Sequence, residues 1–209
     1  MLKVYLADIS NLDIEQDMSL FSDYRKHKIE RINNPLKRKQ SVGAELLLMH
    51  AVKEVVPDFS FPFSIKCGEK GKPEFSDLPL FFSLSHSGIY SACVISDNAV
   101  GLDIEFEQQN NEKIAERFFL KHEKERISLA ADKSSAFSKI WTAKESALKL
   151  LGTGLSKRLS SVGVFDDCVL SEPEGMRINV RWFESGKLCL ALCAKALPER
   201  IHIEKIKLS

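Results

Sequence analysis

Three short apolar segments follow one another between residues 81 and 105, with only tight turns between them. They cover residues 81–85, 90–96 and 99–105, and the turns contain Ser-Gly and Asp-Asn pairs. Short apolar runs bounded by such turn residues are typical of β-strands. Longer segments of helical spacing lie on both sides of this group, so the pattern predicts an α+β fold.

The longest predicted helix covers residues 36–56, where Val42, Leu46 and Met49 recur at helical spacing before Pro57 ends the segment. A second long helix is expected over residues 134–151. Shorter helices are expected over residues 22–33, 111–119 and 121–131. Further strands are expected over residues 1–8, 61–66, 161–165, 177–184, 187–194 and 201–207.

The composition is that of an ordinary globular protein. The 30 Lys and Arg residues nearly balance the 29 Asp and Glu residues, so the charge gives no reason to expect a nucleic-acid partner. No apolar run approaches the roughly 20 residues of a membrane-spanning helix, and the opening segment is too short for a signal peptide. The five cysteines contain no Cys-x-x-Cys pair, which favours buried thiols in a reducing cytoplasm.

The two halves of the chain weakly repeat one another. Residues 86–93 and 184–191 both run from a turn into an apolar strand, and residues 44–45 correspond to 144–145 at nearly the same offset. A true repeat predicts two similar α+β halves, residues 1–99 and 100–209, related by a pseudo-twofold axis with the active site in the cleft between them. A match this short is also compatible with chance.

Two acidic residues alternate along the strand expected near residues 100–106. Because successive side chains point to opposite faces, Asp103 and Glu105 share a face with Gly101, and the aliphatic residues share the other. Neighbouring carboxylates repel one another unless a cation lies between them, and such oxygen ligands suit Mg²⁺ or Mn²⁺. Acidic residues at alternate positions are also common on a solvated strand face, and this segment taken alone favours that interpretation.

The helix expected over residues 134–151 carries a lysine inside its apolar stripe. Lys144 stands where another apolar residue would be expected, with Glu145 at the edge of the stripe and Lys149 one turn further on. A Glu–Lys pair at this spacing is usually only a minor helix stabiliser. A lysine that interrupts a core-facing stripe needs an anion, so the sequence predicts one beside Lys144.

Two upstream segments offer hydrogen-bond donors for phosphate. Ser85 and His86 are expected where a strand enters a tight turn, and Lys72 precedes Pro73 in a glycine- and lysine-rich loop that includes Lys70. The sequence has neither the Gly-x-Ser-x-Gly elbow of serine hydrolases nor a P-loop. A structural histidine and an exposed turn explain these residues equally well when each segment is taken alone.

Taken together and in this order, the segments resemble the phosphopantetheinyl transferase superfamily. Its paired signature, Gly-hydrophobic-Asp-x-Glu and then Trp-x-x-Lys-Glu-x-x-x-Lys, stands here at residues 101–105 and 141–149. The elements at residues 71–73 and 85–87 lie upstream at the family's spacing, and Glu123 lies between the main motifs. The length is similar to that of the surfactin-synthetase-activating (Sfp) type, a monomer whose two similar halves enclose the active site.

The resemblance implies Mg²⁺-dependent transfer of the 4'-phosphopantetheine group from coenzyme A, the co-substrate, to a serine of an acyl or peptidyl carrier protein, with release of 3',5'-ADP. The implied metal ligands are Asp103, Glu105 and Glu145. Glu145, or a water on the metal, is the implied base, and Lys149 would assist the leaving group. The implied coenzyme A contacts are Lys72, Pro73, Ser85, His86, Lys144 and Lys149. Glu123 is a weaker candidate, near the metal.

One segment departs from the family pattern. Many members carry an arginine near the start of the first long helix, where it helps to bind the 3'-phosphate, and this chain has Gly43-Ala44-Glu45 there. The preference for full coenzyme A over its dephospho form is therefore open. The candidates to replace the arginine are Lys28, Arg31, Arg38 and Lys39.

Two other functions are also compatible with these residues. One is another Mg²⁺-dependent phosphoryl-transfer or phosphodiester-cleaving enzyme, and the other is a non-catalytic carrier-binding module of the same fold. Carrier proteins are usually acidic, so the basic residues between 117 and 126, which surround Phe118 and Phe119, form an expected docking surface. A solvated helix face explains those charges nearly as well.

Overall fold

The structure is a computed structural model that describes residues 1–14, 18–68, 71–106, 111–153, 159–172 and 175–208. The chain forms two compact units. Unit 1 contains Met1–Ala99 together with Pro198–Ser209, and unit 2 contains Val100–Leu197. From the sequence, residues 198–209 were expected in the second half of the chain. They belong to unit 1 because strand β11 (Ile203–Lys207) pairs with β1 (Leu2–Asp8).

Unit 1 contains a four-stranded sheet in the order β11–β1–β5–β4. Strand β5 (Tyr90–Ser96) runs antiparallel to both β1 and β4 (Phe81–Ser87), whereas β11 is parallel to β1. The β4–β5 turn contains Gly88, whose φ of 55° lies in the left-handed region that glycine adopts without a Cβ clash. The hairpin of β2 (Ile65–Cys67) and β3 (Pro73–Phe75) completes the strands of this unit.

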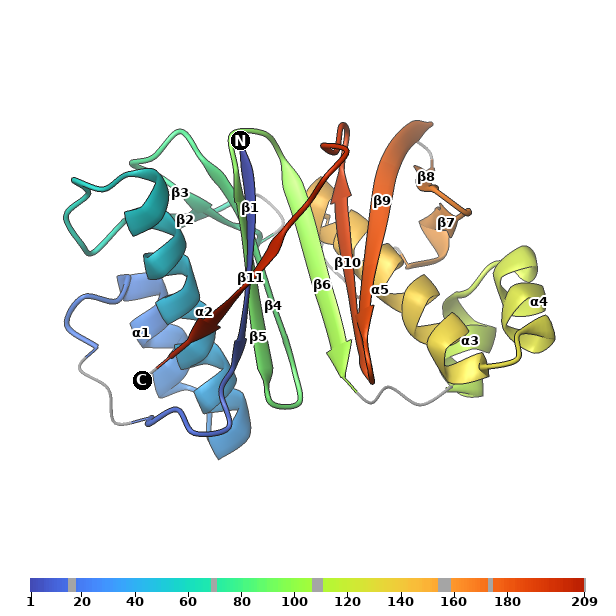
Figure 1. Cartoon of the computed structure of the whole chain (residues 1–209), viewed down its shortest axis with the longest axis horizontal. Coiled ribbons are helices and arrows are strands. Elements are labelled where there is room, and N and C mark those ends of the chain that lie inside the picture. Colours follow the sequence, from blue (N-terminus) through green and yellow to red (C-terminus); the bar gives the residue numbers. More distant parts are fainter. Residues whose placement is uncertain (15–17, 69–70, 107–110, 154–158, 173–174, 209) are drawn as a thin grey trace. The chain divides into compact units, whose positions relative to one another are not determined.

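Helix α2 (Pro35–Val55) packs on the sheet of unit 1 (Figure 1). It begins at Asn34, whose side chain caps the first turn, and Pro35 occupies the first helical position. Of the stripe predicted from the sequence, Val42 and Val52 are buried, but Leu46 and Met49 are only half-buried. The side chains that pack with the sheet also include Leu47 and Leu48, which lie outside that stripe. The shorter helix α1 (Asp23–Glu30) packs against α2.

Unit 2 contains a five-stranded sheet of antiparallel neighbours in the order β6–β10–β9–β8–β7. Helix α5 (Lys133–Leu151) lies against β6 and β10 (Figure 1) and ends at Gly152, whose φ is 65°, as the sequence predicted. The remaining elements are α3 (Glu112–Phe118), α4 (Lys121–Leu129), β6 (Val100–Phe106), a 3₁₀ turn (Leu159–Ser161), β7 (Val162–Val164), β8 (Cys168–Ser171), β9 (Met176–Ser185) and β10 (Leu188–Ala194).

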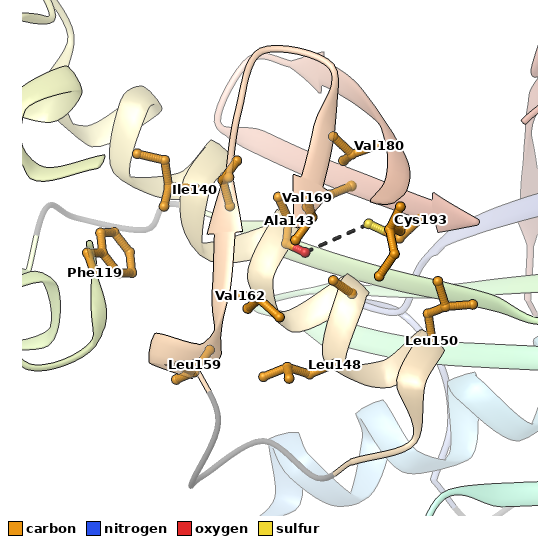
Figure 2. Packing of buried hydrophobic residues seen from close by; sticks show 14 of the residues in the cluster. Phe119, Ile140, Ala143, Leu148, Leu150, Leu159, Val162, Val169, Val180 and Cys193 are labelled. Carbon is orange, nitrogen blue, oxygen red and sulfur yellow. Dashed lines mark hydrogen bonds between the residues drawn. The ribbon is translucent and has the colours of Figure 1, made fainter. Parts of the chain in front are cut away.

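The core of unit 2 lies between α5 and its sheet (Figure 2). Ile140, Ala143 and Leu148 of the helix pack there with valines of β7, β8 and β9. The Cys193 thiol donates a weak hydrogen bond to the carbonyl oxygen of Ala143 at 3.8 Å, and burial raises its pKa to about 12. Four cysteines are buried in this way, but Cys67 is exposed, so the expectation of buried thiols is wrong for Cys67.

The structure departs from the predicted elements where the segments are short. β3 and β8, of three and four residues, were not expected from the sequence, because so short a run shows no clear alternation. Ser85 and His86 lie within β4, opposite Ala92 and Ser91 of β5, and not in the turn. In the part of the chain that the structure describes, no helix has the length and apolar character needed to cross a bilayer.

Candidate metal and phosphate site

Strand β6 and helix α5 approach each other unusually closely at Gly101. A Cβ added there would lie 1.9 Å from the carbonyl oxygen of Ser146 and 2.6 Å from the amide nitrogen of Leu150. Only a glycine allows such contact between a strand and a helix backbone. The face of β6 that carries Gly101, Asp103 and Glu105 therefore lies against α5.

Asp103 is only 3% exposed and lies next to a lysine of α5. The Lys149 ammonium group donates a hydrogen bond to Asp103 Oδ1 at 2.6 Å. A carboxylate buried to this degree is costly without a cation beside it. Asp103 and Lys149 thus form one charge pair, drawn from two elements that are 46 residues apart in the sequence.

Glu105 also contacts α5, at a residue nearer to the start of the helix than Lys149. The indole nitrogen of Trp141 donates a hydrogen bond to Glu105 Oε1 at 3.0 Å. The sequence analysis gave Trp141 no role of its own, although its place one turn before Glu145 puts both side chains on one side of the helix. Trp141 stands in the paired signature, but its hydrogen bond to Glu105 was not expected from the sequence.

Glu145 has an altered proton affinity because of its surroundings. The pKa of Glu145 is raised to about 8, first by burial and then by the charges of Asp103 and Glu105, while the Lys149 ammonium group opposes this shift. Asp103 and Glu105 thus lie close enough to Glu145 to disfavour its negative charge. Repulsion of this kind is relieved by a cation.

The donor chemistry of this set fits a hard divalent cation. All three side chains offer carboxylate oxygens, which Mg²⁺ and Mn²⁺ prefer. Among the described residues, one group of three side chains, which belongs to unit 1, has ligand atoms that all lie within 4.8 Å of one another. Asp103, Glu105 and Glu145 do not meet this spacing. These three carboxylates are therefore spread more widely than that spacing, with Lys149 holding one of them and Trp141 another.

Lys144 meets an anion, as its position in the apolar stripe predicted, but that anion belongs to the protein. Its ammonium group pairs with Glu123 at 2.9 Å and donates to the carbonyl oxygens of Leu159 and Val162. Both charged side chains are 0% exposed. Three partners satisfy the three donors of an ammonium group, so this geometry does not support the expected contact between Lys144 and a bound phosphate.

Glu123 is likewise engaged within the fold of unit 2. Its carboxylate accepts hydrogen bonds from the backbone amides of Leu120 at 2.7 Å and Val164 at 2.8 Å, in addition to the Lys144 ion pair. These contacts connect the start of α4, strand β7 and α5. They give Glu123 a structural role in this geometry, in place of the expected position near the metal.

In unit 1, Lys72 and Pro73 line a pocket of about 320 Å³. Its wall is mostly apolar, and burial lowers the pKa of Lys72 while Glu74 opposes this. Ser85 and His86 are not among the residues that line it. Lys70 lies outside the described residues. The lining residues are Lys66, Lys72, Pro73, Glu74, Phe75, Leu78, Pro79, Leu80, Phe81 and Phe82.

Comparison with known proteins agrees with the signature that these residues form. A family model described as the 4'-phosphopantetheinyl transferase superfamily matches residues 99–202. The chain is 31% identical to 4'-phosphopantetheinyl transferase psf-1 of Bacillus pumilus, over 77% of this chain and 73% of that protein. It is also 31% identical to 4'-phosphopantetheinyl transferase Sfp of Bacillus subtilis, over 75% of this chain and 71% of that protein.

This chain belongs to the 4'-phosphopantetheinyl transferase superfamily. Within that superfamily it is a transferase of the Sfp type, and its mixture of helices and sheets is the predicted α+β fold. A further relative, the transferase gsp of Aneurinibacillus migulanus, is 38% identical over 56% of this chain and 49% of that protein.

The family match covers the acid and lysine residues of this transferase but not its upstream segments. The match at residues 99–202 includes Asp103, Glu105, Glu145 and Lys149. Lys72 and His86 of unit 1 precede the matched residues. A partial likeness to the solved holo-[acyl-carrier-protein] synthase of Thermotoga maritima covers 46% of this chain and 61% of that one, with a TM-score of 0.40 and 21% identity.

The segment where many phosphopantetheinyl transferases carry an arginine forms a buried ion pair in this chain. Glu45 is 1% exposed and pairs with Arg25 at 3.0 Å. It also accepts hydrogen bonds from the backbone amide and the hydroxyl of Ser22. The basic partner therefore comes from α1, and it is oriented toward Glu45.

The basic segment of this transferase is largely paired with acids. Lys124 pairs with Glu116 at 2.9 Å, Lys121 with Glu125 at 3.9 Å, and Arg126 with Asp166 at 3.7 Å. The Arg117 guanidinium lies 5.0 Å from the centre of the Phe118 ring, and Phe119 is buried. These contacts favour an ordinary charged helix surface over a continuous basic docking patch.

Proposed function

We propose that this chain transfers the 4'-phosphopantetheine group of coenzyme A to a serine of an acyl or peptidyl carrier protein, with Mg²⁺ required. The serine oxygen forms a bond to the β-phosphorus of coenzyme A. The bond from that phosphorus to the oxygen of 3',5'-ADP breaks, and the serine proton passes to a base. The reaction therefore needs a proton acceptor and positive charge beside a pyrophosphate.

Asp103, Glu105 and Glu145 would hold Mg²⁺, or Mn²⁺ in its place. The support is the mutual repulsion of these carboxylates across β6 and α5, which raises the pKa of Glu145 to about 8 after the larger effect of burial. When bound, the ion supplies positive charge against the pyrophosphate. The observation that carries the proposal is that Asp103 and Glu105 of β6 contact Lys149 and Trp141 of α5, the helix that also carries Glu145.

Glu145 would accept the proton of the carrier serine. A proton acceptor must be ionised before the reaction. Without a metal, burial and the neighbouring acids raise the pKa of Glu145 to about 8, and a bound cation lowers that pKa and so keeps the carboxylate ionised.

Lys149 would neutralise the pyrophosphate and stabilise the departing 3',5'-ADP. Its ammonium group lies 2.6 Å from Asp103 Oδ1, which holds the side chain at the acid face of α5. A lysine is a compact positive charge of the kind that phosphate groups accept. Lys144, by contrast, is left out of this set because its three donors are used within the fold.

In unit 1, Lys72 and Pro73 would border the adenine of coenzyme A, and Ser85 and His86 would contact the phosphates of the nucleotide. The support for the first pair is the mostly apolar pocket of about 320 Å³ that they line, because ligand sites typically combine apolar walls with a few polar groups. A desolvated lysine such as Lys72 also gains from a phosphate partner. We also propose that the protein acts as a monomer in the cytoplasm.

The direct test uses purified protein, coenzyme A and an apo carrier protein, analysed by intact mass. We expect a gain of one phosphopantetheine on the carrier with Mg²⁺ and none with EDTA. Asp103→Asn and Glu145→Gln should each lower the rate by at least about a hundredfold, since even an outer partner of a metal ligand is worth 10- to 100-fold. Glu112→Gln, an exposed acid at the start of α3, is the matched control.

Two outcomes would contradict the proposal. Breakdown of coenzyme A without modification of the carrier would indicate a phosphodiester-cleaving enzyme that uses the same acids. Carrier binding without any transfer, unchanged by Asp103→Asn, would indicate a non-catalytic module. A panel of apo carriers from fatty-acid, polyketide and nonribosomal-peptide synthesis then identifies the acceptor.

A further inference from the structure

A second group of metal-type side chains belongs to unit 1, whereas the acids of the transfer signature belong to unit 2. His50 and Glu54 are one turn apart on α2, and Glu204 stands on β11. One ligand atom from each of these three side chains lies within 4.8 Å of the other two. The group is partly enclosed, since His50 and Glu204 are half-buried and Glu54 is exposed.

The fold explains why these three side chains converge. Glu204 is the register partner of Tyr5 on the adjacent parallel strand β1, and paired residues of neighbouring strands point to the same face of a sheet. The Tyr5 ring packs edge-on against His50, with the ring centres 5.2 Å apart, and its hydroxyl donates to Glu54 Oε2 at 2.8 Å. Glu204 therefore shares the face of the sheet that α2 covers.

The imidazole of His50 supplies an independent observation. Its Nε2 atom is buried and has no hydrogen-bond partner among the described residues. A buried polar atom without a partner costs free energy, and a histidine nitrogen with a free lone pair is a common metal ligand. The carboxylates of Glu54 and Glu204, each with an oxygen within 4.8 Å of a ring nitrogen of His50, supply the negative charge that a divalent cation requires.

We infer that His50, Glu54 and Glu204 form a binding site for a divalent transition-metal ion, with Zn²⁺ as the probe of choice. Imidazole with carboxylate ligands suits Zn²⁺, whereas Mg²⁺ prefers oxygen ligands alone. The two groups of this chain should therefore differ in selectivity: the acids of unit 2 take the hard ion and the histidine-containing group takes the softer one. The bound ion links the strand near the C-terminal end to α2.

Lys3 is the competing cation at this site. Its ammonium group donates to Glu54 Oε2 at 2.8 Å, the same oxygen that Tyr5 contacts. A metal ion and this ammonium group compete for the charge of Glu54. Removing the lysine charge in Lys3→Met should therefore strengthen Zn²⁺ binding. If Glu54 served only to pair with Lys3, the same substitution would lower the stability of the protein without strengthening Zn²⁺ binding.

The test measures Zn²⁺ retained after gel filtration of the full chain, in excess Mg²⁺ so that the acids of unit 2 are occupied. We expect one Zn²⁺ per chain for the unaltered protein and for His27→Gln, which removes an exposed histidine of α1. His50→Gln and Glu204→Gln should each weaken binding at least about tenfold, the lower end of the loss for an outer partner of a metal ligand. Co²⁺ substitution should give visible absorption that both variants lose.

Thermal unfolding separates metal binding from damage to the fold. In EDTA, Glu204→Gln should unfold near the temperature of the unaltered protein, and Zn²⁺ should raise the Tm of the unaltered protein and of His27→Gln but not that of Glu204→Gln. Retention of Zn²⁺ by all variants, or by none of the proteins, would overturn the inference. Loss of Zn²⁺ in Cys67→Ser, which removes the exposed thiol of β2, would overturn it as well.

Discussion

Gly101 of β6 lies in direct backbone contact with Ser146 of α5. The Ser146 hydroxyl donates a hydrogen bond to the Gly101 carbonyl oxygen at 2.9 Å, and a Cβ on Gly101 would lie 1.9 Å from the Ser146 carbonyl oxygen. The strand residue stands two positions before Asp103, and the helix residue directly follows Glu145. This contact therefore sets the separation between two of the candidate metal ligands.

Gly101→Ala should push α5 away from β6 and lower both stability and transfer. Overpacking a tight contact typically costs about 1–3 kcal/mol, and an added Cβ 1.9 Å from backbone requires a shift of the helix. Urea unfolding measures the first effect and carrier modification at saturating Mg²⁺ the second. Gly68→Ala is the control, because its Cβ would meet nothing closer than 3.4 Å. Equal stability and activity in the two variants would contradict this reading of the contact.

Lys149→Met should slow the chemical step more than it weakens coenzyme A binding. The variant removes the positive charge 2.6 Å from Asp103 that is proposed to stabilise the leaving group. Loss of one such electrostatic contact typically lowers kcat by about a hundredfold or more. Lys149→Arg, which keeps the charge, should recover part of the rate. A rise in KM for coenzyme A with unchanged kcat would instead limit Lys149 to binding.

The raised pKa of Glu145 predicts how stability depends on pH in EDTA. Its carboxyl binds a proton more tightly in the folded state, with a pKa of about 8 instead of about 4.5. The resulting stability is fully present below about 4.5 and is lost as the pH rises through about 8. We expect the Tm in EDTA to fall over this interval, and Mg²⁺ to raise the Tm most at the alkaline end.

Glu145→Gln supplies the control for this pH dependence, because the amide does not titrate. The fall of Tm between about pH 5 and 8.5 should become shallower in the variant, and the benefit of Mg²⁺ should shrink. The same slope in both proteins would show that another group titrates.

The buried Lys144–Glu123 pair should be far more sensitive to substitution than an exposed pair of the same length. Lys144→Met leaves the Glu123 charge without its cation, and breaking a buried pair in this way typically costs about 3–5 kcal/mol. Lys124→Met breaks an exposed pair that also measures 2.9 Å and should cost less than about 1 kcal/mol. Urea unfolding compares them.

A second substitution tests the cause of that loss. Adding Glu123→Gln to Lys144→Met removes the uncompensated charge, so the double variant should be more stable than Lys144→Met alone. A double variant that is less stable than the single one would show that the backbone contacts of Glu123 matter more than its charge.

The sequence predicted the elements and the acid face well, because both depend on periodicity. The alternation along β6 placed Asp103 and Glu105 on one face, and helical spacing placed Glu145 and Lys149 along one helix. What periodicity cannot supply is the identity of a partner from a distant segment. Lys144 was expected to meet an anion, but only the fold shows that Glu123 of α4 provides it.

The errors of the sequence reasoning have a common physical origin in long-range pairing. Ser85 and His86 were placed in a turn, but β4 continues past them because each pairs with a residue of β5. The last strand was placed in the second half, but it pairs with β1 at the other end of the chain. The group of His50, Glu54 and Glu204 was not found, because Glu204 is brought to α2 only by that pairing.

The position of β11 also affects how the protein folds as it is made. Its neighbour β1 leaves the ribosome almost 200 residues before residue 207 does. The sheet that contains β1 thus cannot gain its fourth strand until residue 207 has been synthesised. During translation, one side of β1 stays open to pairing with other chains, so a nascent-chain chaperone should act on this edge.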